Sequence, residues 1–149
     1  MNKANGVEVI LVAEDDPEDC QFIKEAFLDG HARSSLRFVG DGERLLDYLR
    51  HRGDYSDPLA APQPSLVLLD LNMPRKDGRE ALREIKSDPE LKRIPVVVLT
   101  TSKEEEDILR SYDLGANSYV TKPVTFSALA ESLKALGNYW LETVELPPR

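Results

Sequence analysis

The chain has 149 residues, of which 41% are hydrophobic and 31% are charged, which is typical of one soluble globular domain with a buried core. Its formal net charge of −8 argues against binding of nucleic acid or anionic lipid through nonspecific charge attraction. No apolar run approaches the roughly 20 residues that a membrane span needs, and the single cysteine, Cys20, excludes an internal disulfide and suits the reducing cytoplasm.

Short apolar runs rich in β-branched residues recur along the chain and predict five strands. They span residues 7–13, 36–39, 66–69, 94–99 and 118–121. Apolar residues at helical spacing follow each strand, an order typical of right-handed crossovers and of a parallel sheet covered by helices on both faces. We therefore predict a single doubly wound α/β domain over residues 1–149, with its core at about 7–140 and an apolar tail at about 140–149.

Residues with special backbone preferences mark the ends of the predicted helices. Asp16, followed by proline, suits the cap of the first helix. Gly30 and Gly53 are predicted to end the first two helices, and Gly115 the fourth. Residues 52–64 are rich in proline and aspartate and lack strand or helix periodicity, which predicts a long surface loop.

Acidic residues follow two of the predicted strands. If the strand order is 2-1-3-4-5, it reverses between the first and third strands, and ligands of doubly wound sheets bind at such a reversal, outside the carboxyl ends of the strands. Glu14 and Asp15 follow the first strand and Asp70 ends the third, so we expect these carboxylates to converge. They would repel one another without a compensating cation, and an all-oxygen site suits Mg²⁺. Asp15 and Asp70 are predicted as direct ligands, Glu14 as a ligand through water, and the main-chain carbonyl of Asn72 as a further ligand.

A simpler interpretation is that Glu14, Asp15 and Asp16 only cap a helix and place negative charge at its positive end. Acidic ends on two neighbouring strands favour a site instead. Lys122 after the fifth strand and Thr100 at the end of the fourth are expected at the same edge. A carboxylate nucleophile, a metal site, a cation and a hydroxyl are the groups needed to move a phosphoryl group onto a carboxylate.

Four segments resemble, in their order and spacing, the receiver domains of two-component response regulators. They are "EDD" after the first strand, "LLDLNMPRKDG" around the third, "PVVVLTTS" for the fourth and "GANSYVTKP" for the fifth. The likeness extends from residue 9 to about 136 and implies a flavodoxin-like receiver fold in which Asp70 is the phosphoacceptor.

The same resemblance implies roles for the other site residues. Glu14 and Asp15 complete the acidic pocket, and Lys122 pairs with the phosphate. Thr100 is the switch hydroxyl and Tyr119 the switch aromatic. The peptide bond between Lys122 and the following proline is expected to be cis.

The segments "RGDYSDP", "DGREALREIKSDPELKRIPVVVLTTS" and "YWLETVELP" resemble the single-domain response regulators that are paired with bacterial and cyanobacterial phytochromes. This likeness implies a stand-alone receiver in a light-sensing pathway, which takes phosphate from a phytochrome-type sensor histidine kinase. We expect it to signal through protein contacts, with neither an enzymatic output nor direct binding of DNA, because the tail is too short for an output domain.

Three other functions remain open. A magnesium-dependent phosphatase with an aspartyl-phosphate intermediate, of the haloacid dehalogenase type, wants a second aspartate two residues beyond the nucleophile, where this chain has Asn72. A phosphate sink within a relay would use the same acceptor chemistry. A purely structural dimerisation module would leave the site residues without a use.

The tail carries much apolar surface for a chain end. Its apolar residues are Tyr139, Trp140, Leu141, Val144 and Leu146. Burial of such surface is favourable by about 25 cal/mol per Å² before association costs. We expect a homodimer built on the end of the fifth helix and this tail, and the alternative is a tail that folds back over its own domain.

Overall fold

The computed structural model describes residues 8–30 and 34–148, and five parallel strands form its sheet in the order β2-β1-β3-β4-β5. The strands are β1 (Val9–Ala13), β2 (Ser35–Val39), β3 (Leu66–Leu69), β4 (Val96–Thr100) and β5 (Ser118–Thr121). The predicted sheet and its strand order are confirmed, and β3 and β5 have the predicted bounds. The predicted start of the first strand, Val7, lies outside the described residues.

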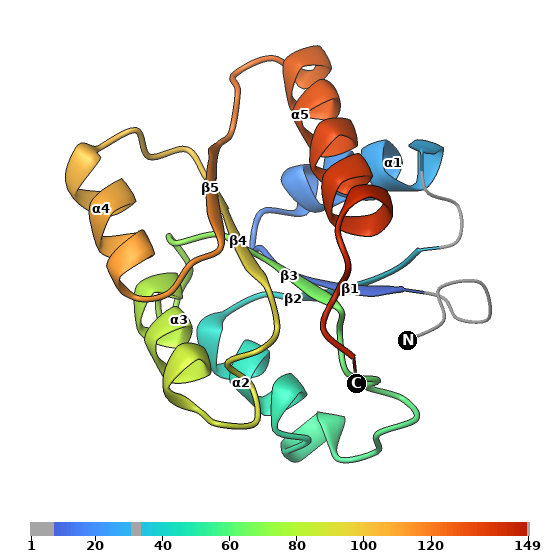
Figure 1. Ribbon diagram of the computed structural model, residues 1–149, viewed down its shortest axis with the longest axis vertical. Coiled ribbons are helices and arrows are strands. Elements are labelled where there is room, and N and C mark those ends of the chain that lie inside the picture. Colours follow the sequence, from blue (N-terminus) through green and yellow to red (C-terminus); the bar gives the residue numbers. More distant parts are fainter. Residues whose placement is uncertain (1–7, 31–33, 149) are drawn as a thin grey trace.

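Helices cover both faces of the sheet, as predicted. They are α1 (Pro17–Gly30), α2 (Gly42–Leu49), α3 (Gly78–Ser87), α4 (Glu105–Asp113) and α5 (Phe126–Asn138). Figure 1 shows α1 and α5 on one face and α2, α3 and α4 on the other. Because both faces are covered, every residue of the central strands β1, β3 and β4 is buried, whereas the edge strands β2 and β5 stay partly exposed.

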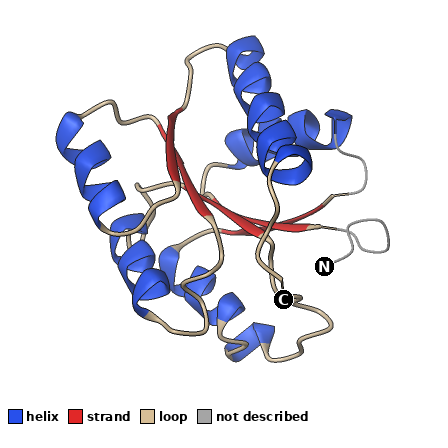
Figure 2. Cartoon of the chain, viewed as in Figure 1, coloured by secondary structure: helices blue, strands red, loops and turns tan. Residues whose placement is uncertain are grey.

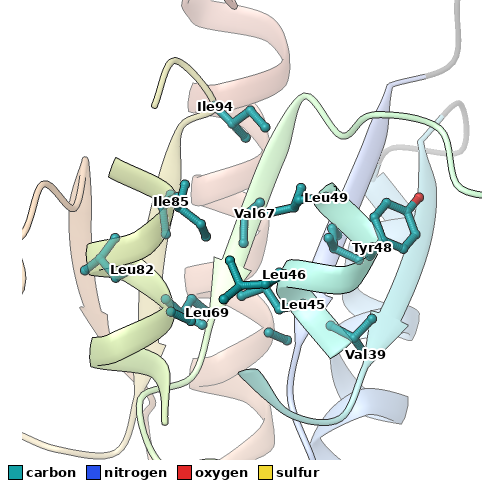
Figure 3. Close-up of a cluster of buried hydrophobic side chains, with 14 of the residues drawn as sticks. Val39, Leu45, Leu46, Tyr48, Leu49, Val67, Leu69, Leu82, Ile85 and Ile94 are labelled. Carbon is teal, nitrogen blue, oxygen red and sulfur yellow. The ribbon is translucent and has the colours of Figure 1, made fainter. Parts of the chain in front are cut away.

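Successive residues of the central strands enter two different cores, because side chains alternate across a strand. Between the sheet and α2 and α3 lies the α2/α3 cluster, which includes Leu45, Leu46, Val67, Leu69, Leu82 and Ile85 (Figure 3). On the other face lies the α1/α5 cluster, which includes Ile10, Ile23, Phe27, Leu68, Leu129 and Leu133. Full burial of each such side chain stabilises the fold by about 1.5–3 kcal/mol, which explains why the strands are continuous apolar runs.

Helix ends agree with the sequence prediction at two of three glycines. Gly30 is the last residue of α1, and Gly115 follows α4 in the left-handed region at φ 107°. The prediction that Gly53 ends α2 is wrong, because α2 stops at Leu49 and Gly53 starts a short 3-10 helix. The chain turns earlier because His51 itself adopts φ 53° and places its Nε2 atom 2.8 Å from the carbonyl oxygen of Ala61.

The tail folds back over its own domain, which is the alternative named above. A π-helical turn (Tyr139–Thr143) follows α5, with Leu141 buried in the α1/α5 cluster. Leu146 is also buried, and the next two residues, Pro147 and Pro148, line a hollow together with residues that precede β3 and β4. Figure 2 shows how the chain runs back along its own domain after the last helix. Leu141 and Leu146 of the tail are therefore covered within one chain, whereas Tyr139 stays 52% exposed. Within residues 8–30 and 34–148, no helix is long and apolar enough to cross a bilayer.

Candidate functional site

Glu14, Asp15 and Asp70 meet at the carboxyl edge of the sheet, where the strand order reverses between β1 and β3. One carboxylate oxygen from each residue lies within 4.8 Å of the other two. They emerge side by side because Ala13 pairs with Leu69 in register and the Asp70 amide donates to the Ala13 carbonyl at 3.0 Å. Glu14 and Asp70 are buried, whereas Asp15 is exposed. The structure thus brings together the three carboxylates, as predicted.

Lys122 enters this cluster from the end of β5 and contacts three carboxylates. Its Nζ atom donates to Glu14 Oε1, donates to Asp19 Oδ2 at 2.9 Å and lies 3.6 Å from Asp70 Oδ2. The peptide bond from Lys122 to Pro123 is trans, so the expectation of a cis bond is wrong for this structure. The lysine still reaches the pocket because its amide is anchored to the end of β4 by a 2.7 Å hydrogen bond to a main-chain carbonyl.

Burial and neighbouring charges change the proton affinity of this cluster. Burial raises the pKa of Glu14 to about 7. The hydrogen bond from Lys122 lowers this pKa, and the negative charge of Asp70 raises it further. Burial alone would lower the pKa of Lys122, but its hydrogen bonds to Glu14 and Asp19 and the charge of Asp70 raise it above the usual value. Lys122 therefore stays a cation, and Glu14 is the residue of this cluster that takes up a proton near neutral pH.

Thr100 ends β4 at the same edge with its side chain completely buried. Its hydroxyl oxygen has no hydrogen-bond partner within the described part of the chain. Leaving a buried hydroxyl unpaired costs about 1–3 kcal/mol, so this donor suits a ligand that brings an acceptor. On the loop after β3, the main-chain N–H of Asn72 donates to Asp70 Oδ1 at 3.3 Å. This contact orients the Asp70 carboxylate through the oxygen that does not face Lys122.

A chain of polar contacts connects Tyr119 on β5 to the start of α3. Tyr119 packs against the α2/α3 cluster, and its hydroxyl donates to the Ser102 carbonyl at 3.0 Å. The Ser102 hydroxyl donates to Asp107 at 2.7 Å, and the Arg79 guanidinium donates to Asp107 at 2.8 Å. Hydrogen bonds from Ser102 and Arg79 lower the pKa of Asp107. This chain fixes the β4–α4 loop next to Thr100.

Asp19, Arg79 and Asp107 belong to the site but were not predicted. Asp19 is the last residue of the acidic run "EDDPED" and the third residue of α1. An acidic residue at that position normally indicates capping of the helix, not contact with a distant lysine. Arg79 and Asp107 stand 28 residues apart on two different helices. Only the packing of α3 beside α4 brings them together, and no sequence spacing signals that pairing.

The donor set fits a hard divalent cation. Carboxylate and carbonyl oxygens are the ligands that Mg²⁺ prefers, and the cluster holds more carboxylates than Lys122 can neutralise. Glu14, Asp15 and Asp70 are placed to hold such an ion. The carbonyl of Asn72 lies in the loop directly after Asp70, and its part as a ligand stays a prediction.

We expect the affinity for Mg²⁺ to rise with pH around neutrality. A carboxyl group whose pKa is about 7 binds a proton below that pH, and the proton competes with the cation. Isothermal titration calorimetry should show a dissociation constant that falls about tenfold from about pH 6 to about pH 8. Glu14→Gln should remove this dependence. A wild-type affinity that stays constant over the range would contradict the assignment.

Comparison with known proteins points to one family. The family model of the response regulator receiver domain matches residues 10–134. Response regulator Rcp1 of Synechocystis sp. is 42% identical over 146 residues, covering 98% of this chain and 97% of that protein. The crystal structure of the phosphorylated cyanobacterial phytochrome response regulator RcpA is 47% identical, with a TM-score of 0.90 and coverage of 95% of this chain and 99% of that chain. The Mn²⁺-bound form of Rcp1 is 43% identical, with a TM-score of 0.88 and the same coverage.

Proposed function

The chain belongs to the family of response regulator receiver domains and is closely related to response regulator Rcp1 and to the cyanobacterial phytochrome response regulator RcpA. On this premise we propose that it accepts a phosphoryl group on Asp70. The observation that carries the proposal is the placement of Asp70 Oδ2 at 3.6 Å from the buried Lys122 ammonium. The adjacent strand ends at Thr100, whose buried hydroxyl has no hydrogen-bond partner within residues 8–30 and 34–148. A fixed cation and a free donor beside a carboxylate favour the charge of an added phosphoryl group.

Each residue then has a chemical task. An oxygen of Asp70 attacks the phosphorus of the donor, while the bond to the leaving group breaks and that group departs with the electron pair. Glu14, Asp15 and Asp70 would hold a divalent cation, which we propose is Mg²⁺, and this ion would supply positive charge to neutralise the phosphoryl oxygens. Lys122 pairs with one phosphoryl oxygen, and Thr100 donates to another. The Mn²⁺-bound structure of the relative Rcp1 supports a divalent ion in this setting.

The physiological donor in this proposal is a phytochrome-type sensor histidine kinase, as the names of the relatives suggest. An autophosphorylated kinase of this type, labelled on its histidine, should transfer its label to the wild-type chain within minutes. Asp70→Asn serves as the control and should leave the label on the kinase. Equal transfer to both chains would contradict Asp70 as the acceptor, and no transfer to either would contradict the pairing with this kinase.

We propose that the Thr100 hydroxyl couples phosphorylation of Asp70 to the contacts of Tyr119. A phosphoryl group adds a charge of about −1.5 to −2 and strong acceptors beside this donor, and movement of Thr100 then disturbs the contacts of the β4–α4 loop. Thr100→Ala should still bind beryllofluoride, a phosphoryl mimic, but lose most of the resulting NMR shift changes at Ser102 and Tyr119. Ser111→Ala is the matched control, because Ser111 carries another buried hydroxyl without a partner in the described residues. Undiminished shifts in Thr100→Ala would rule out this route.

We also propose that the chain forms a homodimer, but through α4 rather than through the tail, because Leu141 and Leu146 of the tail are buried within its own domain. Leu109 and Tyr112 lie one turn apart on α4 and are 66% and 48% exposed. Leu109→Glu should give a monomer in light scattering at micromolar concentration where the wild type is a dimer. Leu59→Glu, at an exposed position in the loop before β3, should not change the mass. A monomeric wild type would refute the dimer.

The phosphatase alternative is not favoured, since the family match is with receiver domains and Asn72 stands where that chemistry needs an acid. We propose the cytoplasm as the location, supported by the single, partly buried thiol of Cys20, whose pKa is raised to about 11 by burial and by the negative charges around it. Such a thiol is unreactive and suits a reducing compartment.

A further inference from the structure

We propose that Asp19 is a positioning residue that holds Lys122 in the unphosphorylated protein and restrains phosphoryl uptake by Asp70. The proposal rests on the function proposed for Asp70. Its basis is the pairing of the Lys122 ammonium with a carboxylate on α1 in addition to the two from the strand ends.

The Lys122 ammonium is committed to other partners before any phosphoryl group arrives. It has three donors, and hydrogen bonds to Glu14 and Asp19 already use two of them. The Asp19 contact, at 2.9 Å, is shorter than the 3.6 Å separation from Asp70. With the lysine side chain only 6% exposed, water cannot easily replace a lost partner. A phosphoryl oxygen on Asp70 can use the third donor, but the negative charge of Asp19, at 2.9 Å, competes for the position of the same ammonium.

Asp19 is the partner that Lys122 can most easily release. The Glu14 carboxylate is 3% exposed, and its second oxygen accepts the Asp16 amide at 3.1 Å, so the residue is held from two sides. The Asp19 side chain is 26% exposed and can turn into solvent, where water satisfies its charge. On phosphorylation, Lys122 is therefore expected to release Asp19 and to pair with the phosphoryl group.

The position of Asp19 on α1 also frees its carboxylate for this task. Asp16 caps the helix by accepting the amides of Glu18 at 2.9 Å and Asp19 at 3.4 Å. The start of α1 is thus satisfied without the Asp19 side chain, which points to Lys122 instead. Replacing Asp19 by asparagine keeps its size and one acceptor oxygen, replaces the other oxygen by an NH2 donor, and removes the charge that competes with the phosphoryl group.

The test compares Asp19→Asn with wild type in the full chain, with acetyl phosphate and Mg²⁺, by intact mass over time. Asp19→Asn should take up the phosphoryl group about threefold to tenfold faster and bind beryllofluoride tighter by a similar factor, as expected for the loss of one partly exposed ion pair. Glu18→Gln is the control, since Glu18 lies on the same turn, is exposed and is not one of the three carboxylates that contact Lys122. Asp19→Glu should return uptake towards the wild-type rate.

NMR of the Lys122 side-chain ammonium gives a readout that does not depend on turnover. Its ¹⁵N signal should shift on beryllofluoride binding in wild type, and Asp19→Asn should show part of that shift before the mimic is added. Uptake by Asp19→Asn that equals wild type, or falls below it, would overturn the inference and leave the function of Asp70 intact. If wild type and Asp19→Asn both fail to take up phosphoryl groups, the proposed function fails and the inference with it.

Discussion

Lys122→Met is expected to lower the free energy of unfolding by about 3 kcal/mol at about pH 8 without divalent cations. Methionine keeps the length and apolar stem of the side chain but leaves Glu14 and Asp70 buried together with no cation between them. Removing one partner of a buried ion pair is costly because the other charge stays desolvated. Chemical denaturation of both chains, followed by circular dichroism, measures the difference.

The loss in this variant should grow as the pH rises. The hydrogen bond from Lys122 lowers the pKa of Glu14, so without it that pKa rises above about 7 in the folded state, against 4.5 for an exposed glutamate. The folded chain then binds more protons than the unfolded chain between these values. This contribution to stability is fully present below about pH 4.5 and is lost as the pH rises through the folded pKa.

Two controls separate this effect from a general loss of packing. Addition of Mg²⁺ should recover part of the stability of Lys122→Met, because the ion replaces the missing positive charge. Lys86→Met removes a half-buried lysine, but Lys86 donates to the carbonyls of Lys92 and Ile94, which do not titrate. Its loss should therefore be similar at about pH 6 and about pH 8. A pH-independent loss in Lys122→Met would contradict the charge balance described for the pocket.

Gly42→Ala is expected to destabilise the fold by about 2–3 kcal/mol and to weaken Mg²⁺ binding. Gly42 begins α2, and its amide donates to the Lys76 carbonyl at 3.0 Å. A β-carbon there would lie 2.1 Å from that carbonyl oxygen, so the loop after β3 would have to move. This loop carries Asn72, and it is also tied to the buried carboxylate of Asp41 through Arg75 at 3.4 Å.

Gly40→Ala is the matched control for this effect. It lies two residues earlier in the same turn, and a β-carbon there meets nothing within 4 Å. It should change both stability and Mg²⁺ affinity very little. Denaturation and calorimetric titration of both variants measure the difference. If Gly42→Ala behaves like Gly40→Ala, the close approach of the loop to α2 does not position the metal site.

The sheet was predictable because its central strands are buried on both faces and therefore appear in the sequence as continuous apolar runs. β3 has the expected bounds because it is a fully buried apolar run that ends where polar residues begin, and the partly exposed edge strand β5 also has the expected bounds. The end of α2 was not predictable from its glycine, because the turn at His51 depends on a contact with Ala61 in a distant part of the loop. The apolar tail indicated a need for burial, but only the structure shows that Leu141 and Leu146 are buried by their own domain.

The candidate site was predictable to the level of strand ends. The reversal of strand order locates Glu14, Asp15 and Asp70, because carboxyl ends of neighbouring parallel strands share one edge. The contacts of Asp19 with Lys122 and of Arg79 with Asp107 were not predictable, because they depend on side-chain directions and on how two helices lie against their neighbours. Those second contacts decide how strongly the lysine and the β4–α4 loop are held.

The most direct test of the central claim is the intact mass of wild type and Asp70→Asn after incubation with acetyl phosphate and Mg²⁺. The account predicts that wild type gains the mass of one phosphoryl group, stable in acid and lost in base as an acyl phosphate is, and that Asp70→Asn gains none. Equal gain by both chains, or no gain by a folded wild type with Mg²⁺ present, would contradict the assignment of Asp70 as the phosphoacceptor.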